Sequence, residues 1–229
     1  MHTDGVIIDQ KHNTQDAATC HTLFIYKVYP SIPNTSTLQN PSSPLLKDPI
    51  LIIKQLPQNC DNCWSTQLNL RCIDPALGVT ETMEFYVKQN DTCACEEMMF
   101  CNVLTQTGAK QLIGRIGCTS GCSDYVFKVY DSNGTVIFSL IGGGGCQDCC
   151  GCKPVEFEFY KGFKEQKLPQ KLVRYPKDAS WLGPRGTFDI NFPAGTPYEQ
   201  RCLCLGLAMM VDLKAFQEQS QNSHYHGQY

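Results

Sequence analysis

Residues 201–216 constrain the fold more strongly than any other part of the sequence. They contain no proline, one glycine and few β-branched residues, so a helix is expected. The uncharged stretch 202–211 covers about 15 Å as a helix, against about 30 Å of bilayer hydrocarbon, so it cannot cross a membrane unaided. Apolar side chains lie nearly all round it, namely Leu203, Leu205, Leu207, Met209 and Met210. We therefore expect a helix buried on all sides, with Asp212 and Lys214 at the end that reaches water.

A period of two in the apolar residues predicts β-strands ahead of this helix. Residues 83–88, 155–160 and 187–192 alternate apolar with polar side chains, which is typical of half-buried strands. The pair Asn133-Gly134 favours a tight type I′ hairpin. A weak repeat of strand, turn, strand and cysteine cluster favours a closed sheet over an open one with bare edges. The expected fold is mainly β, a closed or nearly closed antiparallel β-barrel that encloses the hydrophobic C-terminal helix.

Composition divides the chain into two tails and one folded domain. Prolines alternate with Ser, Thr and Asn before residue 50, so residues 1–50 are predicted to be a flexible tail. Within this tail, only residues 22–29 have the composition of a short strand. Residues 51–216 are expected to form the barrel and its helix, which is a size that suits one domain. Residues 217–229 are polar and are predicted to be a disordered tail.

Charge, cysteine content and histidine positions argue against several classes of protein. The net charge of −3 argues against a dedicated nucleic-acid-binding protein. The first residues lack the apolar stretch of a secretory signal and the fifteen cysteines are an odd number, so reduced thiols are expected. All five histidines lie in the predicted tails, and the glycines at 142–145 lack the lysine of a phosphate-binding loop. No catalytic constellation is visible, and an enzyme is not expected.

Several segments in a consistent order resemble the phospholipid scramblases, which share the tubby-like fold. Glycines and clustered cysteines at 142–152 lead into the acidic-apolar strand at 155–158. Phe188-Asp189-Ile190-Asn191-Phe192-Pro193 is similar to the family's Phe-Gly-Ile-x-Phe-Pro motif. Leu205-Gly206-Leu207-Ala208 and Val211-Asp212 fall where the family helix has its glycine and its Ile-Asp pair, and residues 93–101 fall at its multi-cysteine loop. The likeness covers roughly residues 69–216.

The resemblance implies ATP-independent, bidirectional movement of phospholipids between membrane leaflets. It also implies a place at the cytoplasmic face of the plasma membrane, with a cytosolic or nuclear pool in addition, and protein partners besides the lipids. One departure matters, because the family usually has two or more strands before the position of Leu68. Either residues 22–29 supply a divergent strand or the barrel is incomplete. Two other functions stay open, namely a non-enzymatic tubby-like module that binds lipids or proteins, and a zinc-stabilised cysteine-rich domain.

Cys93, Cys95 and Cys101 align with the loop that the family palmitoylates, so they are the candidate acylation sites. One acyl chain gives marginal membrane binding, and two adjacent thiols supply the two chains that stable anchoring needs. Glu96 and Glu97 follow directly, and anionic lipid would repel them. The alternative is that these are ordinary reduced loop cysteines.

Calcium is the cofactor that the resemblance implies, through an acidic loop before the Phe-x-Ile-x-Phe-Pro strand. Here residues 184–187 are Pro-Arg-Gly-Thr, and Ala194 and Gly195 follow the proline. Only Asp189 and Asn191 remain as oxygen ligands, whereas calcium takes six to eight. We expect weak or absent calcium binding.

Two further clusters carry alternatives. Cys146, Cys149, Cys150 and Cys152 have half-site spacing for zinc, which Cys60 and Cys63 would complete. No histidine lies within ligand spacing, so zinc is less expected than plain thiols. The basic residues Lys161, Lys164, Lys167, Lys171, Arg174 and Lys177 are expected to be a solvated loop, or else to contact anionic lipid headgroups.

Overall fold

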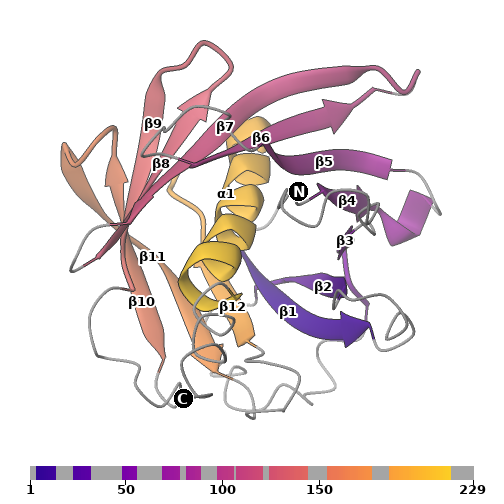
Figure 1. Cartoon of the computed structure of the whole chain (residues 1–229), viewed down its shortest axis with the longest axis horizontal. Helices are drawn as coiled ribbons and strands as arrows, with labels where there is room; N and C mark the ends of the chain where they lie inside the picture. Colours follow the sequence, from indigo (N-terminus) through magenta and orange to yellow (C-terminus); the bar gives the residue numbers. More distant parts are fainter. Residues whose placement is uncertain are drawn as a thin grey trace, which may run out of the picture.

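The computed structural model describes residues 4–13, 23–31, 48–55, 69–77, 81–88, 97–105, 107–120, 124–143, 154–176 and 186–217. Twelve antiparallel strands form one closed barrel, in the order β1-β12-β11-β10-β9-β8-β7-β6-β5-β4-β3-β2, and helix α1 runs through it (Figure 1). The first six strands are β1 (Gly5–Asn13), β2 (Leu23–Pro30), β3 (Leu51–Gln55), β4 (Asn69–Ile73), β5 (Glu81–Lys88) and β6 (Glu97–Leu104). The other six are β7 (Lys110–Ser120), β8 (Tyr125–Asp131), β9 (Val136–Gly142), β10 (Val155–Lys161), β11 (Gln166–Pro176) and β12 (Gly186–Asn191). A 3-10 turn (Pro75–Leu77), helix α1 (Tyr198–Val211) and a π-helical segment (Asp212–Gln217) complete the fold.

The barrel closes through strands at the start of the chain. β1 pairs with β12, with Ile8 opposite Phe188, and also with β2. The prediction that residues 1–50 are a tail is therefore wrong for residues 5–13 and 23–30. The short strand expected at 22–29 exists as β2, but β1 was not foreseen. With both strands present, the barrel has no open edge to leave unpaired.

Every second side chain of the barrel strands points into the barrel and helps to fill its interior, as the sequence pattern predicts. Met83, Phe85 and Val87 of β5 are buried, and Phe157 and Phe159 of β10 are too. Phe127 and Phe157 meet edge to face, with ring centroids 6.2 Å apart, which is a favoured aromatic geometry. The mainly β fold with a closed antiparallel barrel is confirmed.

Helix α1 is buried on all sides, as predicted. Leu203, Leu205, Leu207, Met209 and Met210 are all essentially inaccessible to solvent. Each such side chain contributes roughly 1.5–3 kcal/mol when it leaves water, so the helix is a major part of the core. Gly206 makes close packing possible, because a β-carbon there would lie 3.0 Å from both Cys101 Sγ and Phe85 Cε1. Among the described residues, no helix combines the length and the apolar character that a membrane crossing requires.

The C-terminal end of the helix differs from the prediction. Asp212 was expected to reach water, yet its exposed fraction is 0%. The chain continues past Val211 as a π-helical segment, which carries Asp212 into the barrel beside β1 and β2. Lys214 forms an ion pair with Glu97 of β6 and is mostly covered. The charged residues therefore mark the end of the regular helix and not its exit to solvent.

The β8–β9 connection is a hairpin, but not of the predicted turn type. A type I′ turn needs positive φ at both central residues, and here Gly134 has φ 86° while Asn133 does not have positive φ. The side chain of Asp131 accepts hydrogen bonds from the backbone N–H groups of Asn133 and Thr135, at 2.9 and 2.8 Å. The side chain of Asp131 thus stabilises the connection at residues 132–135, in which Gly134 adopts the left-handed conformation.

Candidate functional site

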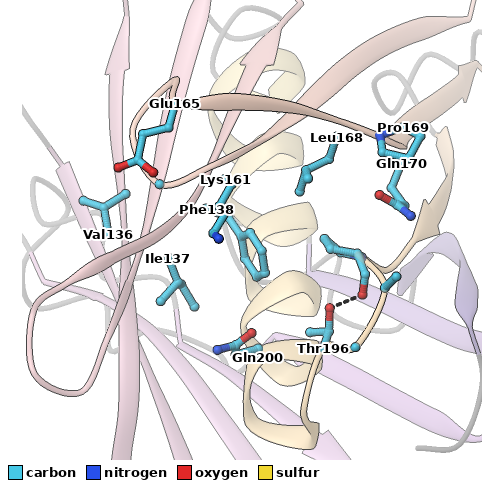
Figure 2. Close-up of a pocket in the computed structure, with 14 residues that line it drawn as sticks. Val136, Ile137, Phe138, Lys161, Glu165, Leu168, Pro169, Gln170, Thr196 and Gln200 are labelled. Atoms are coloured by element: carbon cyan, nitrogen blue, oxygen red, sulfur yellow. Dashed lines mark hydrogen bonds between the residues drawn. The ribbon is translucent and has the colours of Figure 1, made fainter.

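A pocket of about 570 Å³ opens where helix α1 begins, at one end of the barrel (Figure 2). Strands β9, β10 and β11, the loop 193–196 and the first turn of α1 contribute its walls. The lining residues are Val136, Ile137, Phe138, Lys161, Gly162, Glu165, Leu168, Pro169, Gln170, Pro193, Ala194, Gly195, Thr196 and Gln200. Seven of these side chains are apolar and five are polar, so the pocket offers both apolar contact and polar groups to a ligand.

The loop before the helix is fixed by its own hydrogen bonds. The Thr196 hydroxyl donates to the Pro193 carbonyl, and this contact is drawn in Figure 2. Gly195 has φ 74°, a conformation that side-chain-bearing residues adopt rarely. Arg201 Nε donates to the Thr196 carbonyl oxygen at 2.9 Å. The wall of the pocket on the helix side is therefore preformed.

The charges around the pocket are mixed. Pro197 is the N-cap of α1 and provides no side-chain cap, so the first-turn N–H groups carry partial positive charge, but Glu199 lies in the same turn. Gln200 lies on this helical side, while Lys161 and Glu165 come from the β10–β11 hairpin (Figure 2). Among these lining residues there is no cysteine, histidine or serine.

The basic stretch of the sequence is divided by the structure into three environments. The hairpin tip (residues 161–165) carries Lys161 and Lys164 outside the barrel. Lys167 and Lys171 lie on β11 and pair with Glu158 and Glu156 of β10, at 2.6 and 2.5 Å. The hydrogen bond to Lys167 is the main cause of the lowered pKa of Glu158, and the same bond raises the pKa of Lys167.

Arg174 departs from the expectation of a solvated basic loop. Its exposed fraction is 1%, and its guanidinium lies 3.8 Å from the centroid of the Phe216 ring inside the barrel. Arg174 follows Val173 on β11, so the two side chains lie on opposite faces of the strand, and that of Arg174 points into the barrel. Lys177 lies outside the described residues.

The predicted acylation sites separate in the structure. Cys93 and Cys95 lie outside the described residues, so their acylation stays a prediction. Cys101 does not belong to a loop: it lies in β6, faces the helix and has an exposed fraction of 0%. Burial raises the pKa of its thiol well above the ordinary value. A protonated thiol in the core cannot receive an acyl chain in the folded barrel, so Cys101 is wrong as a candidate.

The predicted metal ligands give no metal centre within the described residues. Cys60, Cys63, Cys146, Cys149, Cys150 and Cys152 all lie outside them. No group of three potential ligands gathers among the His, Cys, Asp and Glu residues that are described. Asp189 and Asn191 lie on β12, and burial raises the pKa of Asp189. A carboxyl group that retains its proton more strongly is a poorer calcium ligand, and the expectation of weak calcium binding stays a prediction.

Sequence reasoning missed a buried polar cluster at the other end of the helix. Gln10 Nε2 and the Tyr26 hydroxyl both donate to Asp212 Oδ2, at 2.9 and 2.8 Å. Gln10 Oε1 in turn accepts a hydrogen bond from the backbone N–H of Gly186, at 3.1 Å. The only signal in the sequence is the position of Gln10, which continues the inward side of β1 after Val6 and Ile8.

No protein-family model matches the chain, and comparison with curated proteins and with solved structures yields no match either.

Proposed function

We propose that this chain is a phospholipid scramblase-like protein, which binds phospholipids at a membrane surface and moves them between leaflets without ATP. The observation that supports this most is helix α1 inside the twelve-stranded barrel. That arrangement is what the sequence resemblance to the phospholipid scramblases implies. The proposed place of action is the cytoplasmic face of the plasma membrane, with acyl chains on Cys93 and Cys95 as anchors.

The filled barrel limits how such a protein can act. Most inward side chains of the strands and the buried residues of α1 belong to one apolar cluster. A zwitterionic or anionic headgroup would lose its hydration in that packed core, which is costly. Lipids would therefore pass along the outside of the protein, and the pocket at the start of α1 is the proposed point of contact.

A flip assay tests this proposal directly. The purified chain is reconstituted into vesicles with a fluorescent phospholipid, and a membrane-impermeant quencher then reports the lipid that reaches the outer leaflet. We expect the quenched fraction to rise above the half that lies outside in protein-free vesicles. Ala194→Trp places a large ring at the pocket wall and should slow the flip rate, whereas Ala109→Trp, on the exposed β6–β7 turn, should not. An unchanged quenched fraction with the parent chain would refute lipid translocation.

The second candidate is a non-enzymatic tubby-like module that binds lipid headgroups or proteins and regulates other processes. The filled interior favours it, because binding at a surface pocket needs no route across the bilayer. In the same vesicles, lipid binding that Ala194→Trp weakens, at a flip rate equal to that of protein-free vesicles, would select this function.

A further inference from the structure

The tip of the β10–β11 hairpin exposes an aromatic ring surrounded by cations. Phe163 has an exposed fraction of 49%, and among the described aromatic residues only Tyr198 is comparably exposed, at 48%. Lys128 Nζ lies 5.2 Å from the centroid of this ring and Lys164 Nζ lies 5.6 Å from it. Single exposed apolar residues are common on proteins, so the exposed ring by itself does not indicate a binding surface. An exposed ring with two lysines beside it does indicate one.

The backbone of the hairpin tip holds Phe163 outward. Gly162 has φ 55° and Lys164 has φ 61°, and Lys164 is the one non-glycine residue with positive φ in the described part of the chain. Such a conformation is unfavourable for a lysine and needs support from its surroundings. That support includes the Lys164 N–H, which donates to the Ser139 hydroxyl at 3.1 Å. The turn therefore presents the ring in a fixed position.

The charge around the ring is positive although the whole chain is negative. Lys128, Lys161, Lys164 and Lys167 against Glu158 and Glu165 leave a local charge of +2, while the chain carries −3. The Glu165 carboxyl folds back over Gly162, where a β-carbon would lie 2.5 Å from its Oε1. Glu158 is hydrogen-bonded to Lys167 and Tyr160 on the strands. Both acids are thus directed to the hairpin itself.

From these observations we propose that the hairpin tip, together with Lys128 of β8, is a docking surface for anionic lipid membranes. Phe163 enters the interface between headgroups and acyl chains, and Lys128, Lys161 and Lys164 lie at the level of the lipid phosphates. Charge complementarity favours this partner, and an aromatic ring at the centre of a basic surface gains more from a lipid interface than from an acidic protein or a nucleic acid. The pocket shares Lys161, Gly162 and Glu165 with the tip, so docking would bring its opening to the membrane.

This inference rests on the proposed function, since it names the surface through which the protein reaches its lipid. It is independent of acylation, because an aromatic ring and a basic patch are two signals that add to any acyl chain. The test therefore uses the full chain made in bacteria, which lack the enzymes that palmitoylate proteins.

Binding is measured by flotation with two vesicle types, pure phosphatidylcholine and phosphatidylcholine with about one third phosphatidylserine. We expect binding to the anionic vesicles only, weakened by added salt because the lysine–phosphate attraction is screened. Phe163→Ala should weaken binding about tenfold, from the loss of the buried ring. Phe163→Trp should restore it, since tryptophan suits the membrane interface. Lys161→Ser with Lys164→Ser should weaken binding about 25-fold, or fivefold for each cation.

Leu112→Ala is the matched control, because Leu112 is also exposed, at 42%, and lies in β7 close to the β6–β7 turn. Figure 1 shows the β6–β7 hairpin and the β10–β11 hairpin pointing in different directions. Equal binding of the parent, Phe163→Ala and Phe163→Trp would overturn the proposal, even if the protein moves lipids. Equal binding to both vesicle types would also overturn it. So would a result in which the lysine variant loses binding while Phe163→Ala binds as well as the parent. Loss with Phe163→Ala and rescue with Phe163→Trp would support it, even where no lipid is moved.

Discussion

Polar side chains are buried at one end of helix α1 and exposed at the other. At its C-terminal end, Asp212 is enclosed in the barrel and accepts hydrogen bonds from Gln10 and Tyr26. At its N-terminal end, charged side chains such as Lys161 and Glu165 stay at the surface and surround a pocket. The first end uses polar groups to hold strands together, and the second leaves them available to a ligand. Stability and binding are therefore expected to separate between the two ends.

The largest effect is expected from Asp212→Ala at the closed end. It removes the acceptor shared by Gln10 Nε2 and the Tyr26 hydroxyl, which then lie buried without it. Each buried neutral donor left without its acceptor costs about 1–3 kcal/mol of the free energy of unfolding, and two donors are affected here. Urea unfolding measures the loss, and Asp212→Asn, which keeps an acceptor oxygen, should lose less. If Asp212→Ala were as stable as the parent, the buried polar cluster at this end of α1 would not stabilise the fold, contrary to our account.

Tyr26→Phe sharpens the comparison with a smaller change. It deletes one hydroxyl that donates to a carboxylate and leaves the ring in place. Hydrogen bonds to charged groups contribute about 1.5–3 kcal/mol, so the midpoint of urea unfolding should fall accordingly. In the Asp212→Ala background, Tyr26→Phe should lower the free energy of unfolding much less than it does in the parent chain. Additive losses would mean that the two side chains do not act together.

The pH dependence of unfolding at alkaline pH tests whether the Cys204 thiol, in the middle of α1, is buried. Burial raises the pKa of the Cys204 thiol to about 12, whereas an unfolded cysteine titrates near about 8.5. The unfolded chain loses this proton first, so the stabilisation is complete below about pH 8.5 and is lost as the pH rises towards 12. Cys204→Ala should reduce the fall in unfolding free energy between about pH 8 and pH 10 by about 1–2 kcal/mol. A fall as steep as that of the parent would contradict the burial of this thiol.

The smallest stability effect is expected at the open end. Phe163→Ala and Lys161→Ser change exposed side chains that contribute little to the core. Their unfolding free energies should stay within about 0.5 kcal/mol of the parent. Thermal unfolding followed by circular dichroism measures this. A loss as large as that of Tyr26→Phe would show that the hairpin tip is structural.

The same contrast explains which parts of the fold the sequence could predict. Regular alternation around Phe85 and Phe157, and the all-round apolar helix, follow from local pattern because their burial is purely apolar. Strand β1 was missed because residues 1–50 were assigned to a tail on their overall composition, and because its inward-facing Gln10 interrupts the apolar alternation. Asp212 was misplaced because its partners are distant in the sequence: Gln10 lies 202 residues away and Tyr26 lies 186 residues away. Buried polar groups depend on distant partners that periodicity cannot reveal.

The candidate site was predictable only in part. The basic residues were recognised as a cluster, but their division between the hairpin tip, the ion pairs on β11 and the buried Arg174 depends on strand register. The pocket combines β9–β11 with a loop and the start of α1, and no short segment of sequence encodes it. Cys101 was assigned to a loop because residues 93–101 align with the multi-cysteine loop of the scramblases, whereas it lies in β6 and its side chain packs beside Gly206.

Alkylation of the native chain, followed by peptide mass spectrometry, tests the enclosed helix most directly. The thiols of Cys101, Cys202 and Cys204 are buried on β6 and α1. They should stay unlabelled under native conditions at neutral pH and become fully labelled in urea. Labelling of Cys202 and Cys204 in the native chain as fast as in urea would contradict a helix inside the barrel.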